Sequence, residues 1–80
     1  MEAFFVQLSS VNDVKQFADA ATSLPCEVDV RAGRYLVNGK SVMGLLSIDL
    51  AEPICVEVHG TARQAEQLKS MVADCLAEGK

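Results

Sequence analysis

The spacing of the apolar residues constrains the fold of this 80-residue chain more than any other feature. In "AFFVQL", residues 3–8, the side chains of Phe4, Val6 and Leu8 share one side, which is the period of a half-buried strand. From Val11 onward the apolar residues recur at intervals of three and four residues, the period of an amphipathic helix. Because both periods return further along, the sequence predicts a chain that alternates between strands and helices.

Read to the end of the chain, the two periods predict the order βαββαβα. The predicted strands cover about 2–8, 26–31, 34–38 and "PICVEVHG" (53–60), and the predicted helices cover about 11–23, 42–49 and the stretch from Thr61 to the polar end "EGK". In every strand only one side is regularly apolar, which favours an antiparallel sheet with one open face. We therefore predict an α+β fold in which three helices cover one face of a four-stranded antiparallel sheet.

Hydroxyl side chains mark the predicted helix starts. Ser10 and Ser41 each precede a helix and can accept hydrogen bonds from its first free N–H groups. Asp13, at the third helical position, suits the positive end of the helix dipole. In "TARQ" the side chains of Thr61 and Gln64 form a capping box.

Composition excludes several classes of protein. Eighty residues suffice for a single domain, 1–80, with one modest core. A net charge of −4 without a Lys/Arg cluster disfavours nucleic-acid binding. The N-terminus lacks the pattern of a signal peptide and no run of 18 apolar residues occurs, so we expect a cytoplasmic protein that does not contact membranes.

Three cysteines, Cys26, Cys55 and Cys75, lie far apart and form no C-x-x-C pair. This spacing is not that of a zinc site or a redox motif, so they read as free thiols in a reducing compartment. One histidine and scattered carboxylates also assemble no catalytic set. We expect no metal, no cofactor and no enzymatic activity.

The segment "KSVMGLLSIDL", preceded by "VNG" and set in a βαββαβα chain of this length, resembles the HPr family of phosphocarrier proteins of the bacterial phosphotransferase system. The resemblance spans nearly the whole chain and implies the HPr-like open-faced β-sandwich. Its most specific element, "KSVMG", is similar to the family segment around the serine that HPr kinase phosphorylates. By that match the regulatory position is Ser41.

The family's other signature is a histidine in a Gly-x-His-x-Arg-Pro context at the start of the first helix, which carries a phosphoryl group from Enzyme I to sugar-specific transport proteins. This chain reads "LSSVNDV" there, so Ser10 takes the cap position of the histidine, and Asn12 and Asp13 stand about where the arginine and proline would be. Phosphohistidine transfer needs an imidazole nucleophile and a cation for the phosphoryl oxygens. Since Asp13 would repel phosphate, we predict that this degenerate site does not transfer phosphoryl groups.

Two readings of Ser41 are compatible. Its hydroxyl caps the following helix, and a phosphate on it would meet the same N–H groups and the same dipole. In that helix Val42, Leu45 and Leu46 can share one face while Met43 points elsewhere. A two-turn helix cannot bury all of them against one sheet, so we expect some apolar surface to remain exposed. We predict a partner-binding patch of Val42, Met43 and Leu46, with cover of Met43 by loops or by the chain ends as the alternative.

The resemblance also implies partners for this patch: HPr kinase and, when the serine is phosphorylated, a transcriptional regulator of carbon catabolism. A relative, catabolite repression HPr, likewise lacks the histidine and keeps the serine. The single histidine of this chain, His59, lies on the predicted open face and reads as a solvated residue near a turn, with a relocated phosphohistidine as the alternative.

We therefore expect an HPr-like regulatory or protein-interaction module with a phosphoserine at Ser41. An open sheet face that carries Phe5 and Cys55 is compatible with a monomer or a weak homodimer. Two other functions stay open: a genuine phosphocarrier for sugar transport, which would need His59 or another acceptor, and a small-molecule sensor of the ferredoxin-like regulatory type.

Overall fold

The computed structural model describes residues 2–77. Their elements follow in the order β1 (Glu2–Val6), α1 (Val11–Thr22), β2 (Glu27–Ala32), β3 (Tyr35–Asn38), α2 (Val42–Leu46), β4 (Ile54–His59), α3 (Ala62–Met71), a 3-10 turn (Ala73–Cys75) and β5 (Leu76–Ala77). The predicted order is confirmed up to α3, and the chain adds a short strand after it.

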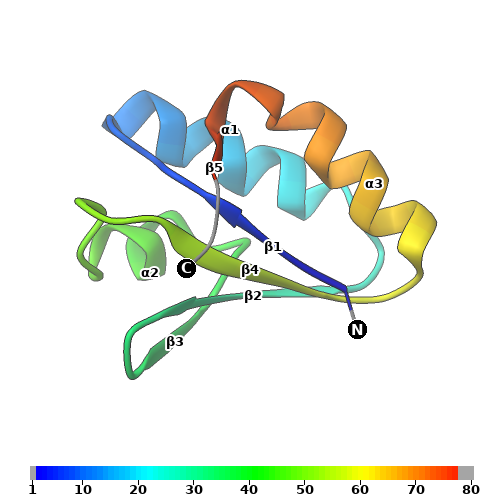
Figure 1. Cartoon of the computed structure of the whole chain (residues 1–80), viewed down its shortest axis with the longest axis horizontal. Helices are drawn as coiled ribbons and strands as arrows, with labels where there is room; N and C mark the ends of the chain where they lie inside the picture. The colour runs from blue at the N-terminus through cyan, green and yellow to red at the C-terminus, as the bar shows by residue number, and fades with distance from the viewer. Residues whose placement is uncertain (1, 78–80) are drawn as a thin grey trace.

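The strands form one antiparallel sheet in the order β3-β2-β4-β1-β5. Figure 1 shows α1 and α3 lying together over one face of this sheet. The short α2 packs against α1 and β3. The open-faced α+β architecture predicted from the alternation is therefore confirmed.

The sheet has five strands and not the four predicted, because the last helix ends earlier than its apolar stripe suggests. α3 stops at Met71, and after a 3-10 turn the backbone of Leu76 is extended, with φ −62° and ψ 140°. Residues 76–77 then pair with Val6 and Phe5 of β1. This pairing satisfies backbone groups at an edge that would otherwise be exposed.

The period-two pattern correctly predicts which side of each strand is buried. Side chains on the helix side of the sheet are nearly inaccessible: Phe4, Val6, Val28, Val30, Ile54, Val56 and Val58. Phe17 of α1 and Leu68 of α3 pack onto them in the same core. The opposite side of β2 and β4 carries Glu27, Asp29, Arg31, Cys55, Glu57 and His59, all at least partly exposed.

Several element ends differ from the prediction by a few residues. β1 ends at Val6, and the backbone N–H of Gln7 donates to the carbonyl of Cys75 at 2.7 Å. The second helix ends at Leu46 and not near residue 49. There the backbone N–H and the hydroxyl of Ser47 both donate to the carbonyl of Gly44, at 3.2 and 2.6 Å, which closes the helix after little more than one turn.

The β2–β3 hairpin turns through Gly33 and Arg34. Gly33 has φ +61°, a conformation that glycine adopts without steric cost. The hairpin leaves β3 as one edge of the sheet.

Candidate functional site

The start of α1 is closed by side chains of its own segment. The hydroxyl of Ser10 accepts a hydrogen bond from the backbone N–H of Asp13 at 3.1 Å, as the capping prediction required. The carboxylate Oδ2 of Asp13 in turn accepts from the backbone N–H of Ser9 at 3.1 Å and from its hydroxyl at 2.9 Å. A negatively charged group of the chain itself therefore occupies this helix start.

These contacts also change the acidity of Asp13. Its pKa is lowered, first by the backbone N–H of Ser9 and then by the Ser9 hydroxyl, because both donate to the ionised form. Asn12 is exposed beside it. The three residues predicted to stand at the degenerate site, Ser10, Asn12 and Asp13, thus lie at the start of α1, and two of them take part in capping.

Ser41 is the N-cap of α2, as predicted. Its Oγ accepts from the backbone N–H of Gly44 at 3.1 Å, and its side chain is half-buried. The preceding Lys40 is directed elsewhere, since its Nζ donates to the carbonyl of Leu24 at 2.9 Å. Ser41 therefore caps α2 as predicted, and its phosphorylation stays a prediction.

The predicted patch of Val42, Met43 and Leu46, called here the α2 patch, is only partly at the surface. Met43 is 84% exposed and Leu46 is 47% exposed, whereas Val42 is half-buried against the core. Leu46, a member of the predicted patch, is exposed because α2 is short and buries Leu45 alone. No described part of the chain covers Met43.

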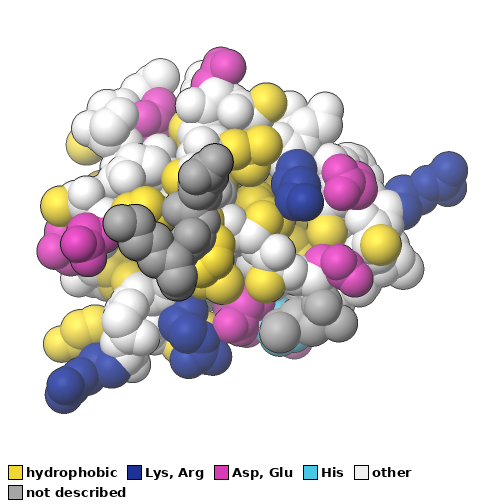
Figure 2. Space-filling view, in the orientation of Figure 1, with side chains coloured by type: hydrophobic (Ala, Val, Ile, Leu, Met, Phe, Trp, Pro, Cys, Tyr) yellow, Lys and Arg dark blue, Asp and Glu magenta, His cyan; other side chains and the backbone are white. Residues whose placement is uncertain are grey.

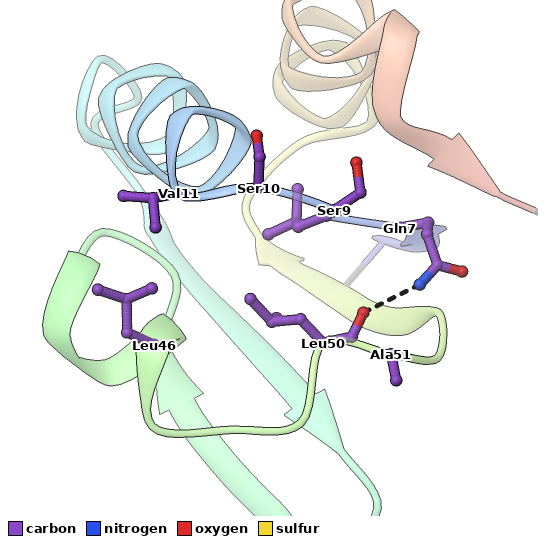
Figure 3. Close-up of a pocket in the computed structure, with 8 residues that line it drawn as sticks. Gln7, Ser9, Ser10, Val11, Leu46, Leu50 and Ala51 are labelled. Carbon is purple, nitrogen blue, oxygen red and sulfur yellow. Dashed lines mark hydrogen bonds between the residues drawn. The ribbon is translucent and has the colours of Figure 1, made fainter.

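A hollow of about 500 Å³ lies between the start of α1 and the end of α2. Figure 3 shows Val11 and Leu46 projecting toward each other at one side of this hollow. At the other side the amide of Gln7 donates to the carbonyl of Leu50 at 3.0 Å and ties β1 to the loop after α2. The first turn of α1 and the α2 patch are therefore neighbours on one surface.

Val11 was expected on the buried stripe of α1 but is 55% exposed. As the first residue of the helix it lies beyond the part of α1 that packs on the sheet, where burial begins with Val14. It adds an apolar side chain to the surface around the hollow. The sequence offered one signal of this exposure, because Val11 comes directly after the capping residue Ser10.

His59 lies at the end of β4 on the open face, as predicted, but it is not simply solvated. Its Nε2 lies 2.9 Å from Oδ2 of Asp29 on β2 and 4.0 Å from Oε1 of Glu57. The other carboxylate oxygen of Glu57 accepts from Nε of Arg31 at 3.0 Å. Among residues 2–77, one group of potential metal ligands converges at a single place, and it consists of Asp29, Glu57 and His59.

The cysteines are free thiols in the part of the chain that the structure describes. Cys75 is buried, and Cys26 and Cys55 are half-buried. Burial raises the pKa of the Cys55 and Cys75 thiols, which keeps them protonated. Neither thiol is thereby activated as a nucleophile.

The basic side chains on one face of the molecule are dispersed (Figure 2). On the face drawn in Figure 2, Lys and Arg side chains are spread around the molecule with Asp and Glu between them. In residues 2–77 no helix has both the length and the apolar character that a bilayer span requires.

The fold is shared with solved structures of phosphocarrier and HPr proteins. Three of them superpose on almost the entire chain. The histidine-containing phosphocarrier protein of Mycoplasma has a TM-score of 0.75 and 17% identity, over 98% of this chain and 100% of its own. HPr-C-His of Thermoanaerobacter tengcongensis has a TM-score of 0.75 and 16% identity, over 92% and 93%. The phosphocarrier protein HPr of Bacillus anthracis str. Ames has a TM-score of 0.71 and 22% identity, over 92% and 95%.

Sequence then identifies the family. Residues 12–78 match the PTS-HPr family, described as the HPr component phosphorylation site of the phosphotransferase system. The chain belongs to the HPr family. No curated protein matches it at a significant level.

Family membership has two consequences. HPr proteins are phosphocarriers that interact with other proteins of the phosphotransferase system, and they are not enzymes. The expectation of a non-enzymatic, protein-binding chain is thereby confirmed. The alternative of a ferredoxin-like sensor is replaced by this assignment.

Proposed function

We propose that this HPr-family chain is a cytoplasmic regulatory module that binds proteins and does not carry phosphoryl groups at the start of α1. The observation that supports this most directly is the contact between Asp13 and Ser9. A carboxylate already accepts the N–H and the hydroxyl of Ser9, at 3.1 and 2.9 Å, where an incoming phosphoryl group would need donors. Ser10, at the cap, offers no imidazole.

Phosphoryl transfer through a nitrogen nucleophile also finds little support elsewhere. His59 is the single histidine of the chain, and its Nε2 is within 4.0 Å of two carboxylates. Negative charge at this distance opposes the approach of a phosphoryl donor. A relocated phosphohistidine is therefore the less favoured reading.

We propose Ser41 as the site at which the module is switched. A phosphate there would replace the hydroxyl as the acceptor of the Gly44 N–H and add charge at the edge of the α2 patch. The segment "KSVMG" resembles the family sequence that HPr kinase recognises. The proposed partners are accordingly such a kinase and a transcriptional regulator.

The proposed docking surface is the α2 patch together with Val11. Met43 and Leu46 are exposed, and Leu46 faces Val11 across the hollow. Apolar groups that are grouped at a surface and include a flexible methionine are typical of protein-binding sites. A monomer or weak dimer remains the predicted oligomeric state, since a module of this kind needs the surface free.

The test is intact-mass analysis of the full chain after two separate incubations. One contains ATP and HPr kinase, and the other contains phosphoenolpyruvate and Enzyme I. We expect one phosphoryl group from the kinase and none from Enzyme I. Ser41→Asn should abolish the modification while keeping a good helix cap, and Ser47→Ala, at the exposed end of the same helix, should leave it unchanged.

Label from Enzyme I would contradict the proposal. Its loss in His59→Gln would then identify the relocated phosphohistidine. Absence of label from both donors would contradict the switch at Ser41 and leave that residue as a cap alone.

A further inference from the structure

We propose that Asp29, Glu57 and His59 form a binding site for a divalent transition-metal ion, with Zn²⁺ as the best-suited ion, on the open face of the sheet. This surface is separate from α1 and Ser41, so the inference does not depend on the proposed function. It rests on the geometry of three side chains held by two paired strands.

The strand register brings the three groups together. Asp29 of β2 stands directly opposite Glu57 of β4, and both point to the open face. His59 is two residues further along β4, on the same side. Because both strands lie in the interior of the sheet order, the backbone that carries these side chains is held by a neighbouring strand on each side.

The distances fit a shared ion. One ligand atom from each residue lies within 4.8 Å of the other two. The separations from His59 Nε2 are 2.9 Å to Asp29 Oδ2 and 4.0 Å to Glu57 Oε1. Nitrogen and oxygen ligands of tetrahedral zinc, at about 2.0–2.2 Å from the ion, lie about 3.3–3.6 Å from each other. Side-chain rotations that lengthen the His59–Asp29 separation and shorten the separations from Glu57 bring all three atoms into this range.

The charge around the group favours a cation. Like charges directly opposite each other in a sheet are destabilising, and Asp29 and Glu57 are such a pair. Arg31 pairs with the far oxygen of Glu57 and leaves Oε1 free. Glu27 stands opposite His59, so three carboxylates face one guanidinium in this part of the sheet.

The contact of Arg31 also orients the carboxylate of Glu57, one of the three proposed ligands. A carboxylate that ligates a metal is commonly oriented by a hydrogen bond to its other oxygen. Nε of Arg31 makes this bond at 3.0 Å. An imidazole and two carboxylates, with water in the remaining positions, form a mixed nitrogen and oxygen set that suits zinc.

The experiment titrates Zn²⁺ into the untagged, reduced full chain near neutral pH and follows NMR spectra. The imidazole of the single histidine gives a specific signal. We expect saturation at one ion per chain, a shift of the His59 ring signals, and amide shifts confined to β2 and β4. The melting temperature should rise with added zinc, because the ion binds only the folded pairing of these strands.

Matched variants separate this site from other zinc ligands. His59→Gln and Asp29→Asn should weaken binding at least about tenfold, the lower end of the effect seen when a supporting partner of a metal ligand is lost. Glu27→Gln removes the same charge from the same face and should cost at most a few-fold. Cys55→Ser tests the nearest thiol on this face and should have no effect.

Three results would overturn the proposal. They are the absence of any zinc-induced shift at the His59 ring, binding that survives both His59→Gln and Asp29→Asn, and binding that is lost in Cys55→Ser. Spectra of each variant without zinc report whether it is folded, so a loss of binding is assigned to the site and not to unfolding.

Discussion

Asp13 and Ser9 form a double hydrogen bond that closes the start of α1, because Oδ2 of Asp13 accepts both the backbone N–H and the hydroxyl of Ser9. Together with the Ser10 cap, this contact satisfies donors at a helix start with groups of the same short segment. The donors of Ser9 are therefore occupied by a carboxylate of the chain itself.

The contact predicts an acid-sensitive contribution to stability. The native pKa of Asp13 is lowered from its ordinary value of 3.8, chiefly by the Ser9 N–H. The unfolded state therefore takes up this proton first as pH falls, so the contribution is complete above pH 3.8 and is lost as pH falls through the lower native value. Urea unfolding at a series of pH values below 3.8 should show the free energy of unfolding falling with pH, and Asp13→Asn should reduce this dependence.

Asp19→Asn is the matched control, since Asp19 is an exposed carboxylate on the same helix. It should leave the acid slope of the wild-type chain unchanged. Equal slopes in the Asp13→Asn variant and the wild-type chain would contradict the assignment, as would an NMR titration in which the Asp13 carboxyl titrates at or above its ordinary value.

Much of the fold follows from local pattern. The alternations that include Val6 and Val56 correctly predict which strand faces are buried, and the caps at Ser10, Ser41 and Thr61 all form as the sequence predicts. Periodicity and capping depend on neighbours within a few residues, so they can be read without knowledge of the tertiary structure.

What the sequence did not predict depends on contacts between distant segments. β5 is a two-residue strand that exists because residues 76–77 meet the edge of β1. The pairing of His59 with Asp29 requires the β2–β4 register, which no local pattern specifies. The difference between an exposed Leu46 and a half-buried Val42 depends on where α2 sits relative to the sheet, and a five-residue helix leaves that choice to tertiary packing.

Leu45 and Leu46 should differ sharply in their contribution to stability. Leu45 is fully buried and anchors α2 to the core, so Leu45→Ala should lower the free energy of unfolding by about 2–5 kcal/mol. Leu46 is 47% exposed, and Leu46→Ala should change it by no more than about 0.5 kcal/mol. Urea unfolding of both variants decides this, and comparable losses would contradict the orientation of α2.

Two glycines near Ser41 should respond to alanine with opposite signs. A Cβ at Gly39 would lie 2.9 Å from Cγ1 and 3.0 Å from the carbonyl oxygen of Val28, so Gly39→Ala should destabilise the fold by about 1–3 kcal/mol. At Gly44 the nearest atom would be Ser41 Oγ at 3.4 Å, an ordinary contact. Gly44→Ala should stabilise α2 by up to about 1 kcal/mol. Thermal melts compare the two variants, and a stable Gly39→Ala variant would show that this turn is not as close to β2 as described.

The capping role of Ser41 and its proposed regulatory role can be separated by the choice of substitution. Ser41→Ala removes the acceptor for the Gly44 N–H and should lower the free energy of unfolding by about 1 kcal/mol. Ser41→Asn and Ser41→Asp keep a good cap, so both should remain within about 0.5 kcal/mol of the wild-type chain. Urea unfolding establishes this ranking before any partner is tested.

Partner binding then tests the proposed phosphorylation switch at Ser41. If phosphorylation is the switch, the kinase-treated wild-type chain should bind a regulator that neither Ser41→Ala nor Ser41→Asn binds, although the two variants differ in stability. Isothermal titration with the treated and untreated proteins measures the difference. A loss of binding in Ser41→Ala that Ser41→Asn restores would instead assign the effect of this hydroxyl to the cap of α2, because only the cap is common to serine and asparagine.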